Sequence, residues 1–217
     1  MTMTLKAYRS IVLCAASVIA IAALSGCSRG EETAQPNVVV NKENAEMRTV
    51  APLIRPIALD KAGEVINLEF EVPPPGPNAV PYLMLGLRLT RPDAASGTAL
   101  SMRLVEAKMA ANVRLLRVEE GAVTMVPLMR NTPDLRDRVT VPVDGSVPGL
   151  TTTSVDTSLL EDAGLLDATL FYDVLQFASA ENIQPGHYRL SMELSADHPE
   201  FQGDNAELLV AYFKKAK

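Results

Sequence analysis

The chain of 217 residues is mildly acidic, because 20 Lys and Arg residues stand against 26 Asp and Glu, a formal net charge of −6. A nucleic-acid-binding domain would normally carry a basic stripe that neutralises phosphates, so we expect no nucleic-acid partner. Two Cys and two His exclude a disulfide-rich scaffold and most zinc sites, and we expect neither a metal nor a cofactor. The length allows one domain or two small ones.

The N-terminus has the pattern of a secretion signal. Lys6 and Arg9 are the only charged residues within residues 1–26, and they precede the apolar run 11–24. As a helix this run would rise about 21 Å, which is short of the roughly 30 Å hydrocarbon core of a bilayer and suits a signal peptide. The residues that follow, Leu24-Ser25-Gly26-Cys27, resemble the bacterial lipobox.

The lipobox resemblance implies cleavage between Gly26 and Cys27 and acylation of the Cys27 thiol, which together anchor the chain in a membrane. Ser28 follows, where an Asp would resemble the signal for retention in the inner membrane. We therefore expect an outer-membrane protein that faces the periplasm. An ordinary signal peptide with a chance Cys, or an uncleaved anchor, remains the alternative.

The mature chain is expected to consist of a tether and one folded domain. Residues 27–51 contain the lipidated Cys and a polar stretch without a sustained period, although Val38-Val39-Val40 offers an edge strand as an alternative. Residues 52–217 are expected to form the domain, since no internal repeat or second composition regime divides them.

Alternation of apolar and polar residues predicts β-strands through most of this domain. In 64–72, Ile66, Leu68, Phe70 and Val72 share one face, which is typical of a half-buried strand. The segments 82–90 and 188–194 alternate in the same way, and 207–213 is apolar on both faces. Shorter strand candidates are 113–118, 123–128, 139–143 and 170–177.

Two helical segments are expected beside the strands. Residues 98–109 fit both a helix and a strand, and their Ala, Leu, Met, Arg, Glu and Lys content favours a short helix. Residues 151–164 read as a loop with a helical turn at 158–163. We therefore predict a mainly β fold, a single antiparallel β-sandwich with one or two short helices, and a barrel is the alternative.

No recognisable catalytic constellation is present. His187 follows a Pro-Gly turn and His198 lies in an acidic loop, and we interpret both as surface residues. The sequence has no Gly-x-Ser-x-Gly elbow, Walker motif or dinucleotide fingerprint. The pair Glu119-Glu120 precedes Gly121 and reads as a hairpin turn. We expect a protein that is not an enzyme, with acid–base chemistry through His198 as the alternative.

Three segments resemble a family of bacterial lipoproteins classed as domain of unknown function 5625. They are 56–63 with the strand after it, 112–121, and the C-terminal part from Ile183-Gln184-Pro185-Gly186-His187-Tyr188 to the last strand. The resemblance implies a small periplasmic β-sandwich whose first two strands form a hairpin, and it supplies no catalytic residues. In this reading Pro185 and Gly186 make a turn, and Tyr188 buries its ring.

The compartment and architecture favour a protein that acts by binding. By association, lipoproteins of this size and location are often immunity proteins that neutralise phospholipase-type antibacterial effectors of type VI secretion. The alternative is a structural or accessory envelope lipoprotein that binds another outer-membrane component or a glycan. The candidate contact residues are loop positions in which Phe201 offers an apolar anchor within an acidic rim: Asp197, His198, Glu200, Phe201 and Asp204. The alternative is that Phe201 packs under its own loop.

Overall fold

Strands are the main regular structure of the fold, as the alternation predicts. A computed structural model describes residues 45–77 and 79–216. Its strands are β1 (Leu53–Ile57), β2 (Ile66–Val72), β3 (Ala79–Arg91), β4 (Ala111–Glu119), β5 (Ala122–Met125), β6 (Met129–Asn131), β7 (Arg138–Thr140), β8 (Ser146–Val147), β9 (Thr151–Thr152), β10 (Phe171–Glu181), β11 (Gly186–Leu194) and β12 (Ala206–Ala216).

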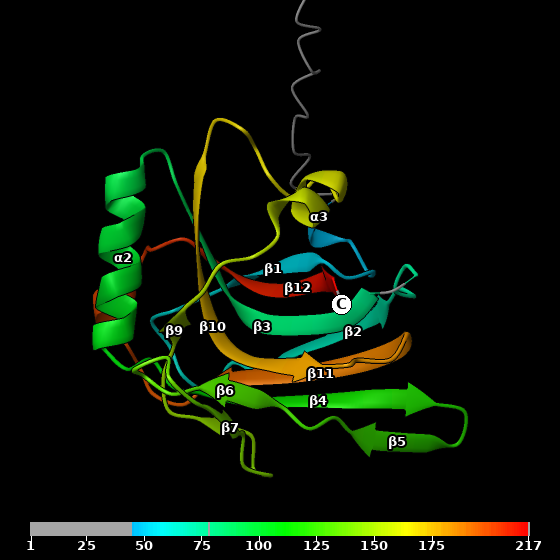
Figure 1. The fold of residues 1–217 in the computed structure, drawn as a ribbon. Coiled ribbons are helices and arrows are strands. Elements are labelled where there is room, and N and C mark those ends of the chain that lie inside the picture. The colour runs from blue at the N-terminus through cyan, green and yellow to red at the C-terminus, as the bar shows by residue number, and fades with distance from the viewer. Residues whose placement is uncertain (1–44, 78, 217) are drawn as a thin grey trace, which may run out of the picture. The chain divides into compact units, whose positions relative to one another are not determined.

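The strands form two antiparallel sheets packed face to face (Figure 1). The larger sheet has the order β1-β12-β3-β10-β6-β7, with β9 also paired to β10. The smaller sheet has the order β2-β11-β4-β5, with β8 also paired to β4. This arrangement confirms the predicted antiparallel β-sandwich.

The main core fills the space between the sheets. The smaller sheet contributes the residues that alternation places on one face, among them Phe70, Leu115 and Tyr188. The larger sheet contributes Leu85 and Leu208 from its central strands. Burial of these side chains supplies the main favourable term in folding, about 25 cal/mol per Å² of apolar surface.

Strand β3 is buried on both faces along most of its length. Leu83, Leu85, Leu87 and Leu89 face the main core as expected. Met84 faces a second apolar cluster on the other side of the larger sheet, together with Leu209 and Leu160. The segment around Leu160 covers this face, so β3 is buried on the side opposite its leucines as well.

The first two predicted strands do not form a hairpin. Strand β2 pairs with β11 in the smaller sheet, and β3 pairs with β10 and β12 in the larger one. The proline-rich segment 73–77 carries the chain from one sheet to the other. Since Pro lacks a backbone N–H for a ladder, this composition suits a crossing between sheets better than a tight hairpin.

Both predicted helices are present. Helix α2 (Ala94–Glu106) begins four residues earlier than expected, because Asp93 caps it by accepting a hydrogen bond from the Ser96 backbone N–H at 2.9 Å. It lies beside β3 and β10 (Figure 1) and buries Leu104 in the main core. Helix α3 (Thr157–Asp162) is the predicted helical turn. A 3₁₀ turn, η1 (Pro199–Phe201), precedes β12.

The folded part begins before residue 52. Ala45 and Ala51 are buried, and Val50 forms an isolated parallel bridge with Glu71 of β2. Residues 45–51, which the sequence pattern assigns to the tether, are therefore packed on the domain. The alternative edge strand at Val38–Val40 and the lipobox at Cys27 lie outside the described residues.

The structure confirms the turn at Gly121 and the burial of Tyr188, and it corrects the interpretation of His187. Gly121 has a φ of 76° in the turn between β4 and β5, as its place after Glu119-Glu120 predicts. Tyr188 is buried in the core. His187, interpreted as a turn residue, lies within β11 opposite Glu71, and its Nδ1 atom is 3.0 Å from the Glu71 carboxylate.

Candidate functional site

The predicted contact loop, residues 197–204, is fastened to a neighbouring loop. The Asp197 carboxylate accepts a hydrogen bond from the Ala62 backbone N–H at 2.8 Å, and the His198 backbone N–H donates to the Asp60 carbonyl at 3.0 Å. The contact loop therefore has a fixed conformation in which the predicted residues do lie together.

Phe201 is not the exposed apolar anchor that the sequence predicts. Its side chain is 1% exposed and belongs to the main core. The ring centroid lies 4.9 Å from the Arg103 guanidinium carbon and 5.9 Å from the His198 ring. The ring is turned inward at the 3₁₀ turn η1, so Phe201 is packed, as the alternative has it, and is not an exposed anchor.

Each acidic residue of the predicted rim already has a partner within the protein, and that of Asp204 is a pair of arginines. Asp204 forms ion pairs with Arg91 at 3.0 Å and with Arg103 at 3.6 Å. Glu200 lies 3.1 Å from His198, and its pKa is lowered by a backbone hydrogen bond and then by His198. Only Asp197 and Glu200 are well exposed among the five predicted residues. This loop is consequently a weak candidate for a binding surface.

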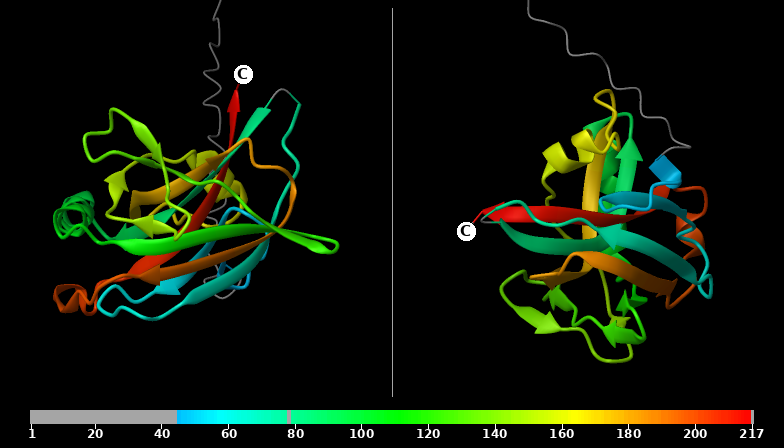
Figure 2. Two further views of the ribbon diagram at one scale, coloured as in Figure 1. Left: turned by 90° about the horizontal axis from the view of Figure 1, so that it is seen from below. Right: turned by 90° about the vertical axis from the view of Figure 1, so that its right-hand side faces the viewer.

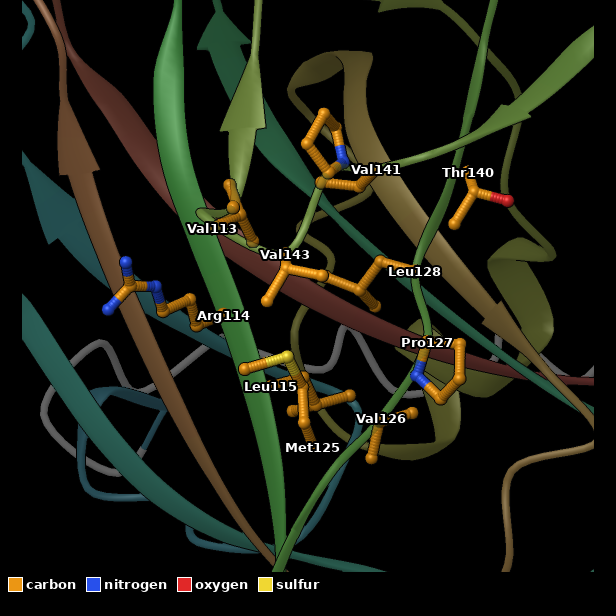
Figure 3. Close-up of a pocket in the computed structure, with 12 residues that line it drawn as sticks. Val113, Arg114, Leu115, Met125, Val126, Pro127, Leu128, Thr140, Val141 and Val143 are labelled. Carbon is orange, nitrogen blue, oxygen red and sulfur yellow. The ribbon is translucent and has the colours of Figure 1, made fainter.

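A better candidate is an apolar groove at the β4–β5 side of the smaller sheet. The groove has a volume of about 210 Å³. Figure 3 shows its lining side chains gathered between β4, the chain that follows β5 and the chain that follows β7. They are mostly aliphatic: Val113, Leu115, Met125, Val126, Pro127, Leu128, Val141, Pro142 and Val143, with Arg114, Thr140 and Gly145.

Exposed apolar side chains extend the groove onto the surface. Val143 is 80% exposed, Val123 is 57% exposed and Met125 is 45% exposed. In the register of the β4–β5 pair, Met125 lies opposite Leu116 and Val123 lies opposite Val118, so these four share the outer face of the smaller sheet. Val123 does not line the groove, whereas Met125 and Val143 do. We call the groove, with its exposed residues Met125 and Val143, the apolar surface.

Strand β5 is an edge strand, and among the described residues its one neighbour is β4. Its sequence Ala122-Val123-Thr124-Met125 contains no charged residue and no Pro, the usual devices that protect an edge from pairing. Figure 2 shows the β4–β5 hairpin, in green, projecting past the neighbouring strands of its sheet. This edge is therefore accessible to an extended segment of another chain.

A second concavity lies on the outer face of the larger sheet. It has a volume of about 450 Å³, and β1, β3, β10, the start of β12 and the segment after α3 line it. Arg88 and Glu207 form an ion pair there, with 2.7 Å between the Arg88 guanidinium and the Glu207 Oε2 atom. We call this concavity the Arg88 cavity.

The described residues contain neither a metal-binding cluster nor a membrane-spanning helix. No three His, Cys, Asp or Glu side chains within residues 45–77 and 79–216 are arranged to hold a metal ion. None of the helices in those same ranges has the length and apolar character needed to cross a bilayer.

Sequence reasoning missed both concavities. A signal existed for the apolar surface, because the predicted strand at 123–128 is uncharged and an apolar residue, Val143, precedes the turn residues Asp144 and Gly145. No comparable signal existed for Arg88, which occupies a polar position of an alternating strand and reads as a solvated residue.

Comparisons with known proteins give no family. No protein-family model and no curated protein matches the chain. A crystal structure of a protein from Sulfurospirillum deleyianum is similar, with a TM-score of 0.39 and 11% identity over 76% of this chain and 98% of that one. A likeness at this level carries no argument about function, and the similarity to the domain-of-unknown-function 5625 lipoproteins stays a prediction.

Proposed function

We propose that this chain is a lipid-anchored outer-membrane protein that faces the periplasm and acts by binding another protein. Its partner in this proposal is a phospholipase-type antibacterial effector delivered by type VI secretion, which the chain neutralises as an immunity protein. The lipobox ending at Cys27 supports the location, and three acyl chains would give an anchor that one chain would not.

The apolar surface is the observation that carries the binding role. Exposed, contiguous apolar residues on a soluble domain often mark sites of protein association. The groove, about 210 Å³, is smaller than the roughly 300–1,000 Å³ typical of pockets for small molecules. It suits one or two aliphatic or aromatic side chains of a partner, and the open edge of β5 can pair with the partner's backbone.

A competition assay tests the proposed function. A strain that lacks the gene is co-cultured with a strain that delivers the effector encoded beside it, and survival is compared with that of the parent. We expect survival to fall on deletion and to return when the wild-type gene is restored. Envelope defects on deletion without any change in sensitivity to the effector would instead support the structural or accessory role.

Variants at the apolar surface test how the protein binds. Met125→Glu places a charge at the mouth of the groove, and Met102→Glu is the matched control because Met102 is an exposed methionine of α2 outside the groove. We expect Met125→Glu to weaken effector binding by about tenfold or more, since it desolvates a charge in an apolar interface. Equal binding by both variants would contradict a role for this surface.

A further inference from the structure

The Arg88 cavity is separate from the apolar surface, because the two sites share no lining residue. Unlike the apolar surface, the cavity contains a buried ion pair, Arg88–Glu207. The Arg88 side chain is 4% exposed and that of Glu207 is 18% exposed. A buried ion pair is weak evidence for stability, because the desolvation of two charges offsets much of their attraction. Its position on the floor of a concavity instead makes it a candidate binding site.

Arg88 is held rigidly, which fixes the geometry of the floor. Its Nε and one terminal nitrogen contact the same oxygen, Glu207 Oε2, and its other terminal nitrogen donates to the Leu165 carbonyl. The guanidinium carbon lies 4.9 Å from the centroid of the Tyr172 ring. The positive charge of Arg88 is therefore matched within the protein, so Arg88 does not create a site for an anion.

The carboxylates of the cavity retain unused acceptors. Among the described residues, no donor contacts Glu207 Oε1. The Asp167 carboxylate accepts from the Thr169 backbone N–H at 2.8 Å and from its hydroxyl at 2.6 Å, which lowers the pKa of Asp167 and keeps it ionised. No basic group of the described residues lies within ion-pair distance of Asp167, whereas Asp204 is paired with Arg91.

The surroundings of the cavity strengthen its negative potential. Between Arg138 and Arg189 the sequence contains no Lys or Arg, and this stretch includes α3 and the segment after it that lines the cavity. Of its carboxylates, Asp167 lines the cavity, and Glu161 and Asp162 belong to α3, which directly precedes the lining segment. Charge of one sign around a concave surface attracts counter-ions toward it.

We propose that the Arg88 cavity binds a single organic cation, a guanidinium or primary ammonium group, between the carboxylates of Asp167 and Glu207. The volume of about 450 Å³ accommodates a small molecule. Leu165 and Leu170 supply apolar surface for the alkyl part of such a ligand, and Thr90 and Asn205 supply further polar groups. The same chemistry can come from a free amine or from the Arg or Lys side chain of a peptide.

The test is a binding titration of the full-length chain in detergent micelles, followed by ligand-observed NMR. The probes are n-butylguanidinium and its neutral isostere n-butylurea. We expect saturable binding of the cation with an affinity about tenfold or more above that of the urea. Equal affinity for the two probes, or no saturable binding of the cation, would overturn the proposal.

Variants locate the site within the chain. Asp167→Asn removes the charge but keeps the oxygen that accepts from Thr169, so it preserves the local fold. Glu207→Gln removes the other charge, and Glu120→Gln in the exposed β4–β5 turn is the control. We expect the first two variants to weaken n-butylguanidinium binding by about tenfold and the control to bind as wild type. Wild-type affinity in Asp167→Asn would overturn the proposal even if Glu207→Gln fails to fold.

A peptide with one Arg flanked by Gly residues distinguishes the two sources of the cation, a protein side chain and a free amine. Binding of this peptide with the same dependence on Asp167 assigns the cavity to a side chain of a protein. Binding of n-butylguanidinium alone assigns it to a free small molecule. Either result supports the cation site, and neither depends on the competition assay that tests the immunity function.

Discussion

Two buried tyrosines differ in what their hydroxyl groups contact, and this difference predicts opposite effects of the same substitution. The Tyr188 hydroxyl donates a hydrogen bond to the Gln184 carbonyl at 2.6 Å, whereas the Tyr212 hydroxyl is buried without a partner among the described residues. Tyr188→Phe should lower the free energy of unfolding by about 1–2 kcal/mol, because it leaves the Gln184 carbonyl without this donor.

Tyr212→Phe is the matched comparison. Removal of a buried, unpaired hydroxyl should leave the free energy of unfolding unchanged or raise it by up to about 1 kcal/mol. Urea denaturation of both variants, at equal m-values, gives the two changes. A larger loss in Tyr212→Phe than in Tyr188→Phe would contradict these hydrogen-bond assignments.

Phe201 shows why a single residue in a loop is hard to place from sequence. A strand residue is placed by the alternation of its neighbours, as Leu190 and Met192 are, but Phe201 stands among polar residues without a period. Its orientation depends on η1 and on the contact with Arg103 of α2, a residue distant in sequence. The sequence therefore identifies the loop but not the direction of its one aromatic side chain.

At the scale of elements, β3 and β10 approach each other at a glycine. A Cβ atom on Gly86 would lie 2.0 Å from the Leu175 carbonyl oxygen, next to the irregular register between Gln176 and Ala178 of β10. Gly86→Ala requires this central pair to separate, and we expect it to lower the free energy of unfolding by about 3 kcal/mol or more.

The control for this prediction is Gly76→Ala. Gly76 lies in the segment between β2 and β3, and a Cβ atom there would meet nothing within 4 Å. We expect its effect on the free energy of unfolding to stay within about 0.5 kcal/mol. Urea denaturation distinguishes the two, and a Gly86→Ala protein as stable as Gly76→Ala would show that β3 and β10 are farther apart than described.

How well an element can be predicted from sequence depends on how far apart in the sequence its contacts lie. Strands β2 and β11 bury one face, so their alternation identifies both the strands and their core residues. Strands β6, β8 and β9 have only two or three residues, too few for a period, and they form because longer strands offer them partners. Sheet membership depends on pairing between distant segments, which explains the wrong hairpin between β2 and β3.

The candidate sites depend even more on distant contacts. The apolar surface combines β5 with the loop at Val143, and the Arg88 cavity combines segments from β1 to β12. Residue type alone does not mark these positions in the sequence, because they form a site only after the fold brings them together. The sequence led to the hypothesis of a binding protein, but it indicated neither of the two candidate surfaces.

At the scale of the whole molecule, several carboxylates make the fold sensitive to acid. Backbone or hydroxyl hydrogen bonds lower the pKa of four aspartates below the value of an unfolded chain, about 3.9: Asp93, Asp134, Asp144 and Asp167. The folded state then binds fewer protons than the unfolded state, so this stability is fully present above about pH 4 and is lost as the pH falls through the lowered pKa values.

We therefore expect the urea midpoint to be steady near neutral pH and to fall as the pH drops below about 4. Asp93→Asn keeps the acceptor for the Ser96 backbone N–H but removes one titrating group. Its midpoint should depend less steeply on pH in this range than that of the wild type. An unchanged midpoint from neutral pH to about pH 3 would contradict the contribution of these carboxylates.

The proposed anchor and the described domain can be separated by one substitution. Cys27→Ser removes the only thiol that the lipobox resemblance marks for acylation, and Cys27 is distant in sequence from the described core residues, which begin at Ala45. Without acyl chains, which contribute about 0.8 kcal/mol per buried CH₂, the domain has no stable hold on a bilayer. We expect the wild-type chain to incorporate labelled palmitate and to fractionate with the outer membrane. Cys27→Ser should incorporate none and leave that fraction, while far-UV circular dichroism still shows a folded β protein. Equal palmitate incorporation by the two chains would refute lipidation at Cys27, and with it the location on which the proposed function rests.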